Sequence, residues 1–265
     1  KNHTAKFTDR ASVAKFKSLL DQNPTAVLGV IEDTVAVLTN GSLAAGVTAG
    51  STEVRALLKE ADKDLSSVTL DSRVTVIDVT NVSNAVFNMN TFLNAGGSGE
   101  RSLQGSPKAR RQSVQVKDTA ANIAASSRSL QLVGNRKVTV TDAGLLSDLK
   151  AISDKAASIT YTDVKDSVTN LTGSNKSLAT GKKVEITDAS VSADNYDTIV
   201  TTVGGSGEVK GKVVDDIANL IDGHDLKGAT DVIANVTADN QDISALSLDS
   251  EIKKIDLMGK KGVIF

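Results

Sequence analysis

Aspartate is the polar residue that recurs most regularly in this chain. An Asp closes most strand-like runs, and in the clearest stretch Asp118, Asp142, Asp163 and Asp188 follow one another at intervals of 24, 21 and 25 residues. A carboxylate directly after a strand can accept backbone N–H bonds from the turn that follows, as a helix N-cap does. We therefore predict that these residues cap turns. The predicted cap residues are Asp9, Asp33, Asp78, Asp118, Asp142, Asp163, Asp188 and Asp216.

Calcium is the alternative use for such a series of carboxylates. Neighbouring carboxylates repel one another, and Ca²⁺ prefers oxygen ligands, so Asp118, Asp142, Asp163 and Asp188 are the candidate calcium ligands. Tandem calcium-binding nonapeptides carry Gly-Gly-x-Gly-x-Asp. The string Gly-Gly-Ser-Gly-Glu, at 96–100 and 204–208, matches only the opening of that motif. The sequence therefore favours capping over calcium and indicates no other cofactor.

Residues that commonly carry catalysis do not gather anywhere in the sequence. The chain has no Cys, and its two histidines, His3 and His224, have no second ligand or orienting partner spaced nearby. The glycine strings are not followed by Gly-Lys-Ser/Thr, so they indicate turns and not phosphate loops. Carboxylates spread at regular intervals are a poor arrangement for acid–base catalysis, which uses one unique site. We expect no catalytic residues and no enzymatic activity.

Around the aspartates the sequence predicts short strands, each followed by a helix or a loop. The runs before Asp142 and Asp188 alternate apolar and polar residues and are rich in β-branched side chains, which is typical of strands. After Asp216, Ile217, Leu220 and Ile221 take helical spacing. The sequence predicts an α/β solenoid with one short strand per coil of about 24 residues, the strands forming a parallel sheet with helices or loops opposite.

The predicted solenoid extends over residues 1–265 as one continuous domain. Residues 1–67 form more divergent coils, and residues 114–265 form the regular ones. Residues 95–113 contain glycines, a proline and a basic cluster, so we predict an exposed insertion loop there. We expect the chain to be a segment of a longer protein.

Composition narrows the classes of partner. The net charge of −2, from 30 basic and 32 acidic residues, argues against a nucleic-acid binder, which normally has a basic face. No apolar run approaches the 18 or more residues of a membrane-spanning helix. Open ends of a solenoid expose unpaired strands, which predicts self-association.

Two stretches of the chain resemble a known class of repeats. The stretches VQVKDTAANIAASSRSLQLVGNRKVTVTDAG and KKVEITDASVSADNYDTIVTTVGG look like the degenerate repeats of very long secreted or cell-surface bacterial proteins. That class includes S-layer-like and adhesin-like chains, among them those of marine cyanobacteria. The resemblance covers most of residues 114–257. It implies an extracellular or cell-surface location, a structural or adhesive role and no catalytic residues.

The sequence thus predicts a structural segment of a large exported surface protein, serving as a spacer, stalk or surface-lattice element. A binding module is the first alternative, in which polar side chains on the sheet face hold a surface glycan or a protein. A phage fibre or another virion component is a further alternative, because such proteins are also repetitive and poor in aromatic residues.

Overall fold

The fold is known from a computed structural model, which describes residues 10–26, 29–39, 53–59, 64–71, 73–78, 82, 85–89, 102–104, 114–134, 136–221 and 223–265. Contacts divide the chain into two compact units. Unit 1 comprises Lys1–Asp118, Ala125–Thr141 and Lys155–Thr160. Unit 2 comprises Thr119–Ala124, Asp142–Asp154 and Tyr161–Phe265.

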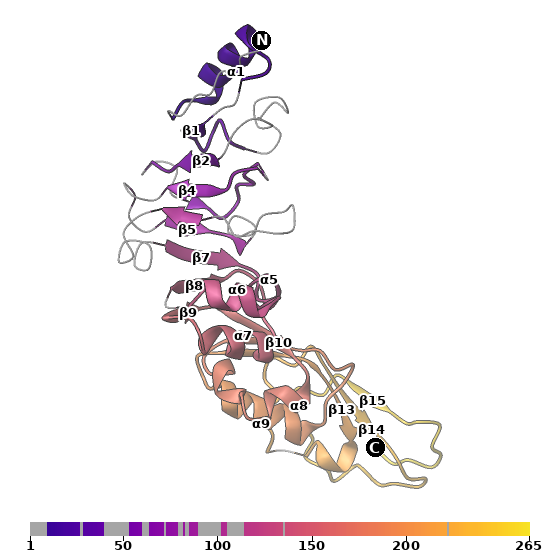
Figure 1. The fold of residues 1–265 in the computed structure, drawn as a ribbon. Coiled ribbons are helices and arrows are strands. Elements are labelled where there is room, and N and C mark those ends of the chain that lie inside the picture. Colours follow the sequence, from indigo (N-terminus) through magenta and orange to yellow (C-terminus); the bar gives the residue numbers. More distant parts are fainter. Residues whose placement is uncertain are drawn as a thin grey trace. The chain divides into compact units, whose positions relative to one another are not determined.

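Unit 1 contains two sheets in which every pairing of strands is parallel. One sheet has the order β1-β2-β4-β6, and the other has the order β3-β5-β7-β8-β9. Figure 1 shows β1, β2 and β4 side by side in that order. The strands are β1 (Val30–Thr34), β2 (Glu53–Leu57), β3 (Asp64–Leu65), β4 (Val76–Asp78), β5 (Ala85–Phe87), β6 (Ser102–Gln104), β7 (Val114–Asp118), β8 (Lys137–Val140) and β9 (Ser158–Thr160).

The strands from β2 to β7 alternate between the two sheets, so each passage of the chain contributes one strand to each sheet. This differs from the predicted single strand per coil. The extra strands β3 and β5 have two and three residues, which is too short for a visible alternation of apolar and polar residues. Strand β6 falls inside residues 95–113, where the sequence predicts an exposed loop, and it pairs with β4. The rest of that segment lies outside the described residues.

Unit 2 contains two three-stranded sheets, again with every pairing parallel. Their orders are β10-β11-β12 and β13-β14-β15. The strands are β10 (Asp163–Asp166), β11 (Lys183–Ile186), β12 (Glu208–Lys210), β13 (Lys212–Asp216), β14 (Asp231–Asn235) and β15 (Lys254–Asp256).

Short helices connect many of the strands. The α-helices are α1 (Val13–Gln22), α5 (Ala120–Ala124), α6 (Ser127–Leu132), α7 (Leu146–Ser153), α8 (Val168–Leu171) and α9 (Ala193–Val203), and the 3₁₀ helices are η2 (Lys176–Ala179) and η3 (Ile217–Asn219). The longest, α9, begins after Ser192, whose hydroxyl accepts the N–H of Asn195, and ends at Gly204, where φ is +77°. Its buried residues, Tyr196 and Ile199 among them, lie on one face.

The core consists of apolar side chains stacked at equivalent positions of neighbouring strands. In unit 2 the buried Val164, Val184 and Val209 occupy one line of register across β10, β11 and β12. Paired strand residues are separated by as few as 19 positions, at Lys212 and Asp231, and by as many as 29, at Ala85 and Val114. We call the chain between two paired strands a crossover. Burial of aliphatic side chains between successive crossovers supplies the main stabilisation of each unit.

Candidate functional site

The recurring aspartates make side-chain contacts between neighbouring crossovers. At six places an Asp carboxylate accepts the backbone N–H of a residue 20 to 29 positions earlier in the chain. We call each of these contacts a carboxylate clamp. The N···O distances are Val13–Asp33 3.1 Å, Met89–Asp118 2.8 Å, Ala120–Asp142 2.8 Å, Leu146–Asp166 2.8 Å, Val168–Asp188 2.6 Å and Ala193–Asp215 2.9 Å.

Each clamp occupies the same place relative to the strand pairing. Gly144 pairs with Val164, and two residues beyond each of them Leu146 donates to Asp166. The same offset of two residues holds at all six clamps. At this point a backbone carbonyl would accept the next N–H of a continuing parallel ladder. The carboxylate takes the place of that carbonyl where the earlier crossover leaves the strand direction.

The donors of five clamps are the first residues of α1, α5, α7, α8 and α9, and the sixth donor, Met89, is also helical. The first N–H groups of a helix have no partner within the helix, and a negative charge there is stabilising. Each of these Asp residues therefore caps the helix of the preceding crossover. The sequence-based prediction assigned the cap to the turn that follows the Asp itself; the structure adds a bond to the helix of the preceding crossover, and the predicted cap Asp33 also accepts the N–H of Thr34 in its own turn.

Some clamps also bind their own turn through the second carboxylate oxygen. Asp215 Oδ1 accepts the N–H of Asp216 at 2.8 Å and the side-chain amide of Asn219 at 2.9 Å. Burial acts to raise the pKa of Asp215, but the hydrogen bonds from Asn219, Ala193 and Asp216 outweigh it and hold that pKa below its usual value. The carboxylate is thus held in its charged form by donors from two crossovers.

Four of the predicted cap residues, Asp33, Asp118, Asp142 and Asp188, are clamps, whereas Asp163 and Asp216 are not. Strand β9 ends at Thr160 and β10 begins at Asp163, so the clamp of that crossover is Asp166 and not Asp163. The side chain of Asp163 accepts the hydroxyl of Thr162.

Asp216 is one residue beyond the clamp Asp215 and makes no side-chain capping bond. Asp78 forms an ion pair with Arg55 at 3.6 Å. Asp9 lies outside the described residues.

The residues proposed for calcium do not form a common site in the described part of the chain. Asp118, Asp142 and Asp188 each accept a backbone N–H. Among the described residues, no three His, Cys, Asp or Glu side chains are close enough together to hold a metal ion.

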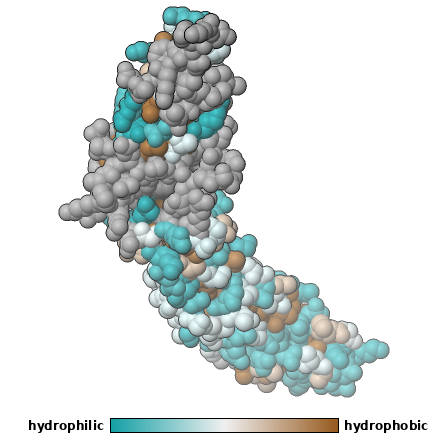
Figure 2. Space-filling model, in the orientation of Figure 1, coloured by the Kyte–Doolittle hydropathy of each residue, from teal (hydrophilic) through white to brown (hydrophobic). Residues whose placement is uncertain are grey.

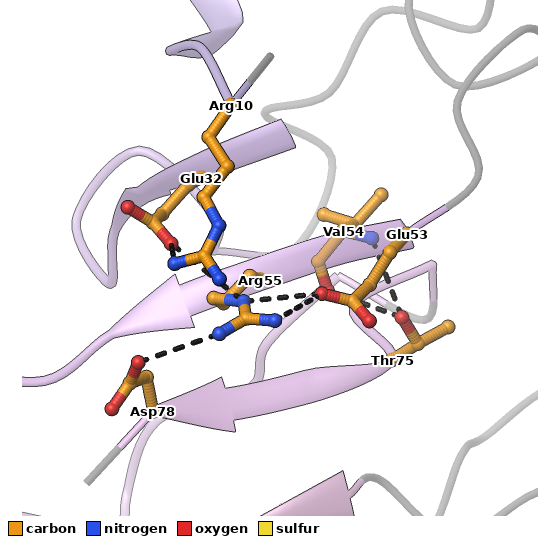
Figure 3. Close-up of polar contacts among 7 residues, drawn as sticks. All are labelled: Arg10, Glu32, Glu53, Val54, Arg55, Thr75 and Asp78. Atoms are coloured by element: carbon orange, nitrogen blue, oxygen red, sulfur yellow. Dashed lines mark hydrogen bonds and ion pairs between the residues drawn. The ribbon is translucent and has the colours of Figure 1, made fainter. Parts of the chain in front are cut away.

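A buried arginine lies at the centre of a group of charges among the described residues of unit 1. Figure 3 shows the guanidinium of Arg55, on β2, among carboxylates from three adjacent strands. It lies 2.6 Å from Glu53, 3.6 Å from Glu32 and 3.6 Å from Asp78, and its side chain is 7% exposed. Arg10 reaches Glu32 from the more exposed side, at 3.0 Å. Three carboxylates around one buried guanidinium tie β1, β2 and β4 together. The sequence alone does not reveal this group, because Glu32 and Asp78 are 46 positions apart.

A groove of about 570 Å³ lies beside the second glycine string in unit 2. Its walls are the end of α9, the turn at 204–208 and residues 225–228. Gly207 is required in that turn, because a Cβ there would come within 2.1 Å of the Val203 side chain and 2.6 Å of the Lys182 carbonyl. Tyr196 lies below, where its hydroxyl donates to the carbonyls of Val209 and Lys227 at 2.8 and 3.3 Å. The string is therefore a turn that borders a groove; its first copy lies outside the described residues.

The remaining sequence candidates contribute little to a site. The Nε2 atom of His224 lies 3.7 Å from Asp194 Oδ1, and its Nδ1 atom is buried without a hydrogen-bond partner. His3 and the basic cluster at 108–111 lie outside the described residues. Figure 2 shows a mainly hydrophilic surface over its coloured part. Exposed apolar side chains among the described residues include Met258 and Leu145.

No helix among the described residues is long and apolar enough to cross a membrane. Comparison of the chain with protein-family models, curated proteins and solved structures gave no match.

Proposed function

We propose that this chain is part of an α/β solenoid and serves as a non-enzymatic structural segment of a large exported surface protein, as a spacer, stalk or surface-lattice element. The observation that carries the proposal is the carboxylate clamp, because one contact with one geometry joins neighbouring crossovers at six places.

A contact of this kind suits a molecule that is extended by copying units. In a solenoid each unit contacts only its neighbours, so its stability is close to a sum of neighbour interfaces. The clamp also selects the register: only when Gly144 pairs with Val164 does the N–H of Leu146 meet the carboxylate of Asp166. A slip by one residue would leave a helix N-terminus and a carboxylate without partners, which disfavours misaligned stacking.

Force spectroscopy tests the solenoid part of the proposal. When the chain is pulled from its ends, we expect unravelling in steps of roughly 20 to 25 residues, which at about 3.5 Å per extended residue gives increments of about 70 to 90 Å. One event that releases the whole chain at once would contradict an array of semi-independent crossovers.

Surface labelling tests the location. An antibody against this chain is expected to stain intact cells that make the parent protein, and external protease should remove the stain. Staining that needs permeabilised cells would contradict an exported surface role.

The second candidate function is a binding module for a surface glycan or a protein, and the groove beside Gly204 favours it. A cavity of this size is within the range of small-ligand sites. Thr201 lines the groove, so Thr201→Trp should fill it and abolish binding on a glycan array or in a pull-down, whereas the exposed Asn195→Trp, on another face of the same helix and outside the groove lining, should not. Equal binding by both variants would remove the groove from consideration.

A further inference from the structure

The outward face of the β10-β11-β12 sheet presents a regular pattern of alternating charges. The register places Asp163, Lys183 and Glu208 in one row across the three strands. Two residues further along, Lys165, Glu185 and Lys210 form a second row. The sign alternates along each row and also between the rows. We call these six residues the charge grid.

Five residues of the charge grid are exposed and Asp163 is half-buried, while the residues between its rows are buried. The side chains of Lys165, Glu185, Glu208 and Lys210 are 47%, 56%, 47% and 59% exposed. The intervening Val184 is buried, because successive side chains of a strand point to opposite faces.

Within the chain the grid already contains two ion pairs, Lys165–Glu185 at 2.8 Å and Lys210–Glu208 at 3.3 Å. A shallow hollow of about 130 Å³ lies over the same strands. The side chains of the grid are therefore accessible to a partner.

We propose that the charge grid is a contact surface for a second copy of this chain, in which two sheets meet face to face with their strands antiparallel. A two-fold axis midway between the two sheets, parallel to their planes, perpendicular to the strands and level with Val184, exchanges the two rows. Asp163 then faces Lys165 of the second copy, Lys183 faces Glu185, and Glu208 faces Lys210, and each pair occurs twice. Every charge meets the opposite sign.

The same pattern disfavours the parallel arrangement in which all three strands overlap. An axis parallel to the strands and centred on β11 places Lys183 against Lys183 of the second copy and Asp163 against Glu208, so every facing pair has like charges. Like charges in contact across an interface are strongly unfavourable. When all three strands of both copies are in contact, the grid thus favours the antiparallel orientation. This inference does not depend on the proposed surface location.

The size of the grid sets the strength of the contact. Three strands about 4.8 Å apart, with two rows about 7 Å apart, cover on the order of 200 Å². A stable interface buries about 800 Å² on each partner, so a single grid gives a weak, salt-sensitive association. Several such contacts along a longer parent would add through multivalency.

Two double charge reversals test the proposal. The variant Asp163→Lys/Glu208→Lys makes the first row entirely basic, and Lys165→Glu/Lys210→Glu makes the second row entirely acidic. In the proposed arrangement each variant brings like charges together with its own copy. Mixed with one another, the two variants restore opposite signs at every position. The contact should then be lost in either variant alone and return in the mixture.

The measurement is sedimentation equilibrium over a concentration series, at about 0.01 M and about 0.5 M salt, where the screening lengths differ severalfold. We expect wild type to self-associate only at low salt. Each variant alone should associate at least about tenfold more weakly, and the mixture at least as strongly as wild type.

A control pair with the same net charges moved elsewhere, Asp154→Lys/Glu251→Lys and Lys155→Glu/Lys261→Glu, separates the grid from general charge attraction. Each control alone should associate like wild type.

Three results would overturn the proposal. These are a wild type that is monomeric at every concentration in low salt, a grid variant that self-associates like wild type while keeping its circular dichroism spectrum, and a grid mixture that associates no more than the control mixture. Association of the two grid variants with each other also shows that both have folded.

Discussion

The clamp Asp166 offers the most direct test of how neighbouring crossovers are held together. The change is Asp166→Asn, which keeps the size of the side chain but replaces one carboxylate oxygen by an NH₂ group. In the native protein Asp166 is 3% exposed. Its Oδ2 accepts the N–H of Leu146 at 2.8 Å, and its Oδ1 accepts the N–H of Ser167 at 2.8 Å and the side-chain amide of Asn170 at 2.7 Å.

The magnitude follows from these three donors. An asparagine has one acceptor oxygen, so at least one of the two backbone N–H groups must face an NH₂ group and lose its bond. A buried donor left unsatisfied costs about 1–3 kcal/mol, and hydrogen bonds to a charged acceptor are worth about 1.5–3 kcal/mol. We expect Asp166→Asn to lower the free energy of unfolding by about 2–4 kcal/mol.

The matched control is Asp163→Asn, at the first position of the same strand. Its carboxylate lies at the partly exposed start of β10 and accepts the hydroxyl of Thr162. The expected loss is below about 1 kcal/mol, as for an exposed polar contact. Both variants are compared with wild type by urea unfolding followed by circular dichroism.

Amide hydrogen exchange supplies a second, local measurement. Because contacts are mainly between neighbours, unfolding can begin in one part of the chain. In Asp166→Asn the amide of Leu146, at the start of α7, should exchange faster, although it lies 20 positions away in the sequence. The reasoning is refuted if Asp166→Asn is as stable as Asp163→Asn, or if the exchange of Leu146 does not change.

Four further predictions follow from contacts in the two units. Gly207→Ala should lower the melting temperature by several degrees, since the added methyl would clash at 2.1 Å and overpacking costs about 1–3 kcal/mol, whereas Gly205→Ala, with no atom within 4 Å of its Cβ, should be neutral. Arg55→Ala leaves the facing carboxylates without their guanidinium and should cost about 3–5 kcal/mol in urea unfolding, against at most about 1 kcal/mol for the half-exposed Arg10→Ala. The pKa of Asp215 is lowered in the folded state, so its contribution to the free energy of unfolding is present above the unfolded pKa of about 3.9 and is lost as the pH falls through the folded pKa. The difference in stability between wild type and Asp215→Asn should therefore shrink below about pH 4. Excess chelator should leave the melting temperature unchanged, because a metal bound to the native state would raise it.

Part of the fold follows from the sequence because its signal is local. The alternation of Val184 and Ile186 with polar residues predicts a strand, and β11 covers these residues. The sequence also predicts a single strand from Ile159 to Asp163, because Thr160, Tyr161 and Thr162 are all acceptable in strands. The structure ends β9 at Thr160 and starts β10 at Asp163, and the predicted cap was therefore three residues too early.

The partners of the aspartates could not be predicted from local pattern. An Asp that caps its own turn and an Asp that caps a helix 20 to 22 residues earlier look alike in one sequence. They are distinguished only when the register of the parallel strands is known, since the clamp lies two residues beyond a strand pair. The charges around Arg55 were missed for the same reason: Glu32, Arg55 and Asp78 come together only through the pairing of β1, β2 and β4.

The clamps also bear on the order in which the parts of the chain become stable during synthesis. Each capping Asp comes after the helix that it serves, by 20 to 22 residues for the five clamped helices. During synthesis from the N-terminus, the first N–H of a newly synthesised helix therefore lacks its carboxylate acceptor until the next 20 to 22 residues have been made. The crossover synthesised last therefore has an uncapped helix, and the next crossover supplies its cap. On this reasoning the crossovers are stabilised in the order in which they are translated.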